Sequence, residues 1–199
     1  MSATASGGDG VEEFIVMCTG QLEFGTLPGC DSAYCKYAFV HGDDWRVMDG
    51  LEDGITQITR KSTGADKRLV WNFPIEITYK STNVYGWPQL CFSVFEVDAL
   101  GRDIIRGYGM LHIPAFAGRY DREVRLFRPM SASLYQQFVS WITGVPAEFT
   151  DPRFVCRGEG REVTRVRSSG ALELQLNVIT KDMAAFGYSD QRFNGHGSR

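Results

Sequence analysis

The feature that most constrains the fold of this chain is the alternation of apolar and polar residues within short segments. In residues 171–180 (ALELQLNVIT), leucine or valine occupies every second position, and glutamate, glutamine and asparagine separate them. Because successive side chains of an extended strand point to opposite sides, this pattern predicts a strand with one buried and one solvated face. Aromatic residues, which favour strands, make up 13% of the 199 residues.

Similar segments recur at intervals of roughly ten residues along the chain. The clearest is Leu69–Lys80 (LVWNFPIEITYK), in which Pro74 has no N–H to donate and therefore marks a bulge, a break or an edge. We expect Gly20 to end the first strand. The remaining candidate strands are residues 14–19, 34–40, 55–60, 89–97, 104–113 and 120–127. About eight short strands separated by turn residues predict an all-β antiparallel sandwich.

The rest of the chain predicts one helix and two tails around a single domain. In Ser133–Ile142, apolar residues spaced three and four apart form one stripe, which is typical of a short helix. Residues 1–10 are polar and rich in glycine and serine, so we expect a disordered leader. Residues 189–199 are expected to form a polar tail, which leaves residues 11–188 as the domain.

The net charge and the cysteine content argue against two classes of protein, nucleic-acid binders and secreted disulfide-bonded proteins. The net charge of −3 argues against a dedicated nucleic-acid binder, which would usually be basic. The five cysteines are odd in number and form no CxxC pair. The first residues lack the features of a signal peptide, and the longest apolar run is too short to cross a bilayer. We therefore predict a cytoplasmic protein with reduced thiols.

The motifs of catalysis are missing from the sequence. None of the three histidines, His41, His112 and His196, has a sequence partner that would orient it as a general base, and GxSxG does not occur. The cysteines and histidines are too loosely spaced for zinc, and no phosphate-binding loop is present. We expect no enzyme activity and no cofactor.

Four acidic residues form the strongest candidate for a metal site. Glu96, Asp98 and Asp103 resemble the third calcium loop of C2-type domains, but Glu96 replaces an aspartate and Asp103 comes one residue early. Asp31, in a segment that resembles another loop of those domains, is also out of register. Calcium takes about six to eight oxygen ligands, so we interpret this set as a degenerate calcium loop and expect no bound metal. The alternative is a solvated turn.

A basic segment stands out against the acidic background. Between residues 153 and 167, five arginines face two glutamates, a net charge of +3. The arginines are Arg153, Arg157, Arg161, Arg165 and Arg167. They are candidates for binding anionic lipid or an acidic partner surface, and the alternative is an ordinary solvated loop.

Two aromatic residues mark a loop that separates two candidate strands. Tyr85 and Trp87 flank Gly86 and precede Pro88. If these side chains are exposed, they would anchor a protein partner or enter a membrane. If they are buried, they would close one end of the sandwich. We favour burial or a protein interface.

Several longer strings resemble the B9-domain family. They are GLEDGITQITRKS, LVWNFPIEITYKSTNVYGWPQL, GRDIIRGYGMLHIP and GEGREVTRVRSSG, and the resemblance extends over residues 14–188. It implies a C2-like β-sandwich and a non-catalytic scaffold subunit of the tectonic-like, Meckel-syndrome complex at the ciliary transition zone and basal body. That complex is implied to form a membrane diffusion barrier and to support ciliogenesis and Hedgehog signalling.

The same resemblance implies particular partners. These are the paralogous B9 domain-containing protein 2, the Meckel syndrome type 1 protein and other members of the tectonic-like complex. The alternative function is that of a peripheral C2-like module that binds anionic lipid, with or without calcium.

Overall fold

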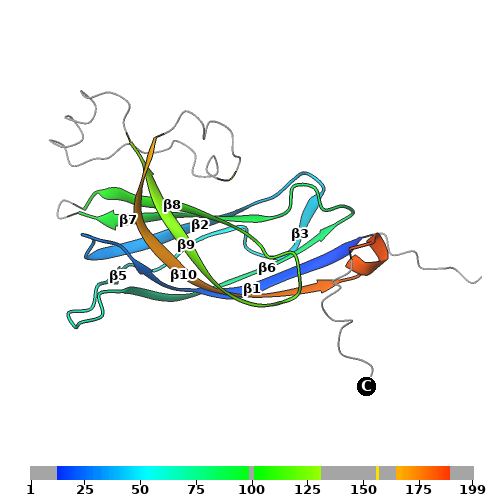
Figure 1. Cartoon of the computed structure of the whole chain (residues 1–199), viewed down its shortest axis with the longest axis horizontal. Coiled ribbons are helices and arrows are strands. Elements are labelled where there is room, and N and C mark those ends of the chain that lie inside the picture. Colours follow the sequence, from blue (N-terminus) through cyan, green and yellow to red (C-terminus); the bar gives the residue numbers. More distant parts are fainter. Residues whose placement is uncertain (1–12, 99–100, 131–155, 157–164, 189–199) are drawn as a thin grey trace, which may run out of the picture.

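The structure is a computed structural model that describes residues 13–98, 101–130, 156 and 165–188. Within these residues the chain forms ten strands and a short 3₁₀ helix, which confirms the all-β fold class (Figure 1). The predicted helix Ser133–Ile142, the leader 1–10 and the tail 189–199 lie outside the described residues. No helix among the described residues is long and apolar enough to span a membrane.

All paired strands run antiparallel to their neighbours. The elements are β1 (Phe14–Thr26), β2 (Ser32–Val40), β3 (Trp45–Gly50), β4 (Asp53–Ile55), β5 (Thr59–Arg60), β6 (Leu69–Ser81), β7 (Gln89–Val97), β8 (Asp103–His112), β9 (Gly118–Pro129), β10 (Val166–Lys181) and the 3₁₀ helix η1 (Met183–Phe186). The strand order is β3-β6-β1-β10-β9-β8-β7-β2-β4, with β5 also paired to β2.

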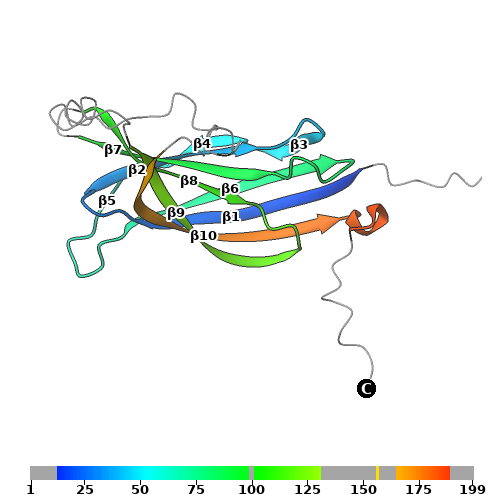
Figure 2. The ribbon, with the colours of Figure 1, turned by 45° about the horizontal axis from the view of Figure 1, so that its top comes forward.

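The sheet folds over on itself between β8 and β9. These two strands share a single residue pair, Tyr108 with Phe127, whereas β9 and β10 pair along nearly their whole length. The result is two layers, β3-β6-β1-β10-β9 and β8-β7-β2-β4, stacked as a sandwich (Figures 1 and 2). Strands β3 and β4 are the edges of the two layers.

The core lies between the two layers and confirms the predicted alternation in β10. Its side chains Leu172, Leu174, Leu176 and Val178 are all buried, and they pack with alternate residues of β1, β2, β6 and β7. A second, smaller cluster joins Tyr34, Phe95, Ile105 and Tyr108 on the other face of β2 and β7. Strand β7 is therefore buried on both faces, and this explains why it lacks alternation.

Two predicted strands have the wrong bounds, and one strand was not predicted. Gly20 does not end the first strand, because β1 is a central strand that pairs with β6 and β10 through Gly20 and beyond. The predicted strand 55–60 is divided into β4 and β5, since Thr56 turns inward and its hydroxyl accepts the backbone N–H of Cys35 at 2.9 Å. Strand β3, which the pattern did not indicate, follows the turn at residues 41–44.

The irregularity expected at Pro74 lies just before this residue, whereas Pro74 itself is in regular register opposite Gln21. The pairing of β1 with β6 slips between Leu22, opposite Phe73, and Phe24, opposite Val70. Asn72, inside this bulge, has φ of 47°, a left-handed conformation that asparagine tolerates better than most residues.

The expectation of reduced thiols is wrong for two of the five cysteines. Cys91, on β7, forms a disulfide with Cys156, and their Cα atoms lie 6.4 Å apart. The pair is separated by 65 residues in sequence, so spacing alone could not reveal it. Cys18, Cys30 and Cys35 are free and buried.

Candidate functional site

The predicted calcium-loop residues lie at the end of the sandwich where β1 turns into β2 and β7 turns into β8. Strand β7 presents Glu96 next to the turn at Asp31, and the Asp31 backbone N–H donates to a Glu96 carboxylate oxygen at 3.3 Å. The other carboxylate oxygen of Glu96 forms an ion pair with Arg106 on β8. A guanidinium therefore occupies the side of Glu96 that a cation would need.

Asp98 is bonded in a similar way within its own turn. Its carboxylate accepts the backbone N–H of Arg102 at 2.8 Å and forms an ion pair with the Arg102 guanidinium at 2.7 Å. Asp103 and Asp31 are exposed. Among the described residues, no three histidine, cysteine or acidic side chains converge as metal ligands would. The geometry fits structural ion pairs better than a calcium cage.

The two aromatic residues of the 83–88 loop behave differently. Trp87 is half-buried, donates its indole N–H to the Ile113 carbonyl at 2.7 Å, and packs edge-on against Trp45 with ring centroids 4.9 Å apart. Tyr85, by contrast, is 80% exposed. Trp87 therefore closes one end of the sandwich, whereas the Tyr85 ring stays available to a partner.

A glycine contact holds that loop in place. The Gly42 N–H donates to the Gly86 carbonyl at 2.9 Å, and Gly86 has φ of 64°. A Cβ on Gly86 would collide with the backbone of Gly42, so this close approach requires glycine.

The predicted basic segment is only partly described. Arg165 and Arg167 are exposed, while Arg153, Arg157 and Arg161 lie outside the described residues. Strand β10 places Arg167 directly opposite Arg128 of β9. The tertiary structure therefore extends the basic segment to a strand that the sequence pattern had not connected with it.

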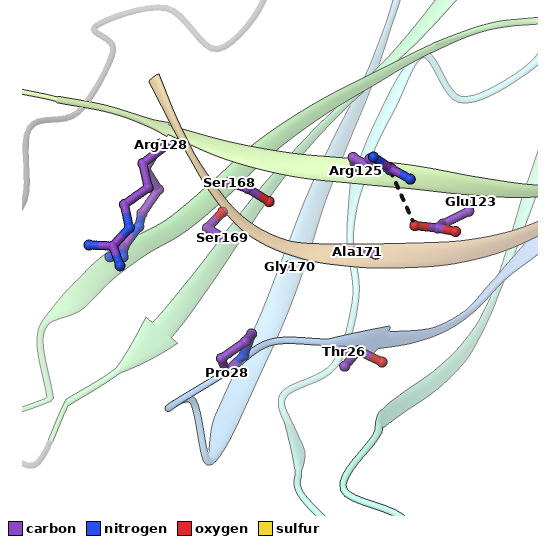
Figure 3. A pocket seen from close by; sticks show the side chains of 10 residues that line it. Thr26, Pro28, Glu123, Arg125, Arg128, Ser168, Ser169, Gly170 and Ala171 are labelled. Atoms are coloured by element: carbon purple, nitrogen blue, oxygen red, sulfur yellow. Dashed lines mark ion pairs between the residues drawn. The ribbon is translucent and has the colours of Figure 1, made fainter. Parts of the chain in front are cut away.

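These residues form a groove, which we call the arginine groove. It has a volume of about 560 Å³ and is lined by Arg125, Arg128, Arg167, Ser168, Ser169, Gly170, Ala171, Glu123, Thr26 and Pro28 (Figure 3). In Figure 3, Arg128 lies beside Ser168 and Ser169, and Arg125 lies further along β9 next to Glu123. The Arg125–Glu123 ion pair is long, 3.6 Å, and both side chains are largely exposed.

Among the described residues, three arginines and one glutamate line the arginine groove. Burial, together with the neighbouring guanidinium groups of Arg106 and Arg167, lowers the pKa of Arg128 below its ordinary value. Across the described ranges, no carboxylate lies within 4 Å of the Arg128 or Arg167 guanidinium. Like charges directly opposite one another on paired strands are destabilising, so an anion bound between them would stabilise the fold.

Sequence reasoning missed Arg125 and Arg128 because their strand is distant in the chain from the basic segment. Residues 119–128 do contain a signal, since arginine recurs at every third position. Only the register of β9 against β10, however, shows that Arg128 meets Arg167.

Comparisons with known proteins show what this chain is similar to. Residues 16–179 match the family model B9-C2, described as "Ciliary basal body-associated, B9 protein". B9 domain-containing protein 1 of Xenopus laevis is 51% identical over 180 residues, covering 90% of this chain and 91% of that protein. The human B9 domain-containing protein 1 is 53% identical over 175 residues, 88% of this chain and 86% of that protein.

More distant likenesses also occur. B9 domain-containing protein 2 of Danio rerio is 29% identical over 157 residues, covering 79% of this chain and 88% of that protein. A C2 domain of plant Extended Synaptotagmin 1 is 13% identical with a TM-score of 0.40, covering 82% of this chain and 92% of that one. The family match spans the sandwich from β1 to β10, and the first relatives match over nearly their full length. The chain therefore belongs to the B9 protein family.

Proposed function

We propose that this protein is a non-catalytic scaffold subunit of the tectonic-like, Meckel-syndrome complex at the ciliary transition zone. The single observation that supports this most is membership of a family described as ciliary basal body-associated. In this proposal the protein contributes to the membrane diffusion barrier, and through it to ciliogenesis and Hedgehog signalling. Its partners are the paralogous B9 domain-containing protein 2 and the Meckel syndrome type 1 protein.

The edges of the sandwich supply a physical reason to expect protein partners. Strands β3 and β4 end the two layers, and an unpaired strand edge offers backbone N–H and C=O groups to another chain. Large apolar side chains accompany these edges: Leu51, in the turn that joins them, is 70% exposed, and Ile55 of β4 is 59% exposed. Met48 of β3 is also exposed. Burying these side chains against a paralogue would favour assembly.

Co-purification with the two named partners tests the proposal. Leu51→Lys and Ile55→Lys place a charge on the edges, where burial in an interface would then be costly, so both variants should lose at least one partner. Ile179→Lys is the matched control, because Ile179 is 50% exposed but lies on the central strand β10. Failure of the parent protein to associate with either partner would contradict the scaffold role.

The control decides what a loss means. If all three variants lose their partners equally, the edges are not the contact surface and the loss comes from general surface charge. If none does, the partners bind elsewhere. Reversal of Arg161 and Arg165 to glutamate tests the basic segment as an alternative contact for an acidic partner surface.

A further inference from the structure

Arg128 and Arg167 lie directly opposite each other on paired strands and line one groove. Arg128 is half-buried, and the positively charged groups that repel its guanidinium are those of Arg106 and Arg167. Arg106 is already paired with Glu96, so its charge is balanced, whereas within the described ranges no carboxylate lies within 4 Å of the other two. The register of β9 against β10 thus holds two guanidinium groups of like charge side by side.

The chemistry of the groove favours a phosphate ligand. A guanidinium presents a planar fork of N–H donors that matches phosphate oxygens in pairs, and two such forks match the charge of one phosphomonoester. Ser168 and Ser169 also line the groove, and Arg125 extends the positive charge along β9. A volume of about 560 Å³ leaves room for a headgroup with more than one phosphate.

The surroundings of the groove favour a membrane as the source of that phosphate. Beyond the two arginines the strand pair continues, since the Met130 N–H donates to the Arg165 carbonyl at 2.8 Å. Met130 and Val166, next along the two strands, are both about half exposed, 46% and 50%. Exposed apolar side chains bordered by arginines are the arrangement that a lipid interface stabilises, because the apolar groups enter it while the cations meet the headgroups.

We propose that the arginine groove binds the phosphomonoester headgroup of a phosphoinositide at a membrane surface. This binding is independent of the scaffold role, because the groove is formed by β9, β10 and the end of β1, and the edge strands are β3 and β4. The protein would then bring its partners to a membrane that carries phosphoinositide.

Flotation of the full chain with vesicles of defined composition tests the proposal. Phosphatidylcholine vesicles containing phosphatidylinositol bisphosphate should recruit the protein at low salt, where screening is weakest. Vesicles matched in surface charge with phosphatidylserine should recruit it less, because phosphatidylserine lacks a phosphomonoester. Equal recruitment by the two kinds of vesicle, or none by either, would overturn the proposal.

Variants locate the binding on the molecule. Arg128→Gln with Arg167→Gln removes both forks, and each lost charge at a membrane surface corresponds to about a fivefold weaker affinity, so the pair should weaken it about 25-fold. The control is Arg119→Gln with Arg122→Gln, which removes the same charge from exposed positions on β9 outside the arginine groove. Equal loss in both double variants would show a response to net charge alone and overturn the site.

Two further readouts separate the remaining explanations. The Arg128→Gln, Arg167→Gln variant should melt no lower than the parent, because it removes a repulsive pair, so weaker binding would not reflect unfolding. Calorimetric titration with soluble inositol trisphosphate should show the same dependence on the two arginines. Binding of this soluble ligand without recruitment to vesicles would overturn the membrane source.

Discussion

Glu96 on β7 and Arg106 on β8 form an ion pair between neighbouring strands at the loop end of the sandwich. The other Glu96 oxygen accepts the Asp31 N–H, so both carboxylate oxygens already have partners. Glu96 belongs to the acidic set that resembles a calcium loop in sequence. Its structural partners give Glu96 a different role, which is to connect β7, β8 and the β1–β2 turn.

Calcium is expected to leave the stability of this protein unchanged. A ligand bound only by the native state must raise the melting temperature, and here the Glu96 and Asp98 carboxylates are committed to arginines. A thermal melt in millimolar calcium should therefore coincide with one in a chelator. A rise with calcium but not with magnesium would show that the ion displaces the arginines, contrary to this expectation.

Replacement of Tyr79 by phenylalanine is expected to stabilise the protein. Tyr79 is fully buried among Phe39, His41 and Trp45, and among the described residues its hydroxyl has no hydrogen-bond partner. Burial also raises the pKa of this hydroxyl. Removing an unsatisfied polar group should increase the free energy of unfolding by about 1 kcal/mol, measured by urea denaturation.

The control for this prediction is Tyr85→Phe, which removes a hydroxyl from a ring that is already in water and should change the unfolding free energy little. A clear loss of stability in Tyr79→Phe would mean that the hydroxyl is hydrogen-bonded to a water molecule.

Glu173 is expected to destabilise the protein at neutral pH. Partial burial, with Glu123 opposite it on β9 and Glu23 nearby, raises the pKa of Glu173 above its ordinary value of 4.5. A raised pKa in the folded state means that the charged form is penalised by folding, and the penalty disappears as the pH falls below the unfolded value. Glu173→Gln should therefore raise the melting temperature at about pH 7 and have little effect at about pH 4.

Glu76→Gln provides the comparison for this pH experiment, since Glu76 is exposed on β6. An equal increase at both pH values for Glu173→Gln would point to a packing effect of the amide and contradict the electrostatic cause.

Thiol titration should distinguish two classes of cysteine. Burial raises the pKa values of Cys18, Cys30 and Cys35, to about 11 for Cys30, so a thiol reagent should react slowly with the folded protein. After unfolding without a reductant, three thiols should react, because Cys91 and Cys156 are joined. After reduction, all five should react. Five thiols in the first condition would mean that the purified protein is reduced at this pair.

The alternation of apolar and polar residues predicted the strands that have one buried and one solvent-exposed face. It did not predict strands, or parts of strands, that form because a neighbouring strand pairs with them. Strand β10 was predicted because its core and solvent faces alternate residue by residue. Strand β3 has little alternation, with most of its residues exposed, and it forms because β6 offers an edge. Strand β1 continues past Gly20 because it has hydrogen-bonding neighbours on both sides, which outweigh the low strand preference of glycine.

The candidate sites show the same division. Glu96 and Trp87 were singled out from their residue types and positions, but their partners, Arg106 and Trp45, depend on strand register and packing. The partner of Asp98 is local, since Arg102 follows it in the same turn. Arg128 was not identified as a candidate from the sequence. It becomes one only because strand pairing places it opposite Arg167 of β10.

By itself, the sequence determined the all-β class, the alternating core of β10 and the kinship with B9 proteins, because periodicity and long motifs are properties of the chain. Only the tertiary structure decided that Glu96 meets an arginine, that Cys91 meets Cys156, and that Arg128 meets Arg167. The physical reason is that each of these pairs joins residues from different strands or segments. Their proximity follows from antiparallel register and from the folding of one sheet into two layers, which local sequence patterns do not specify.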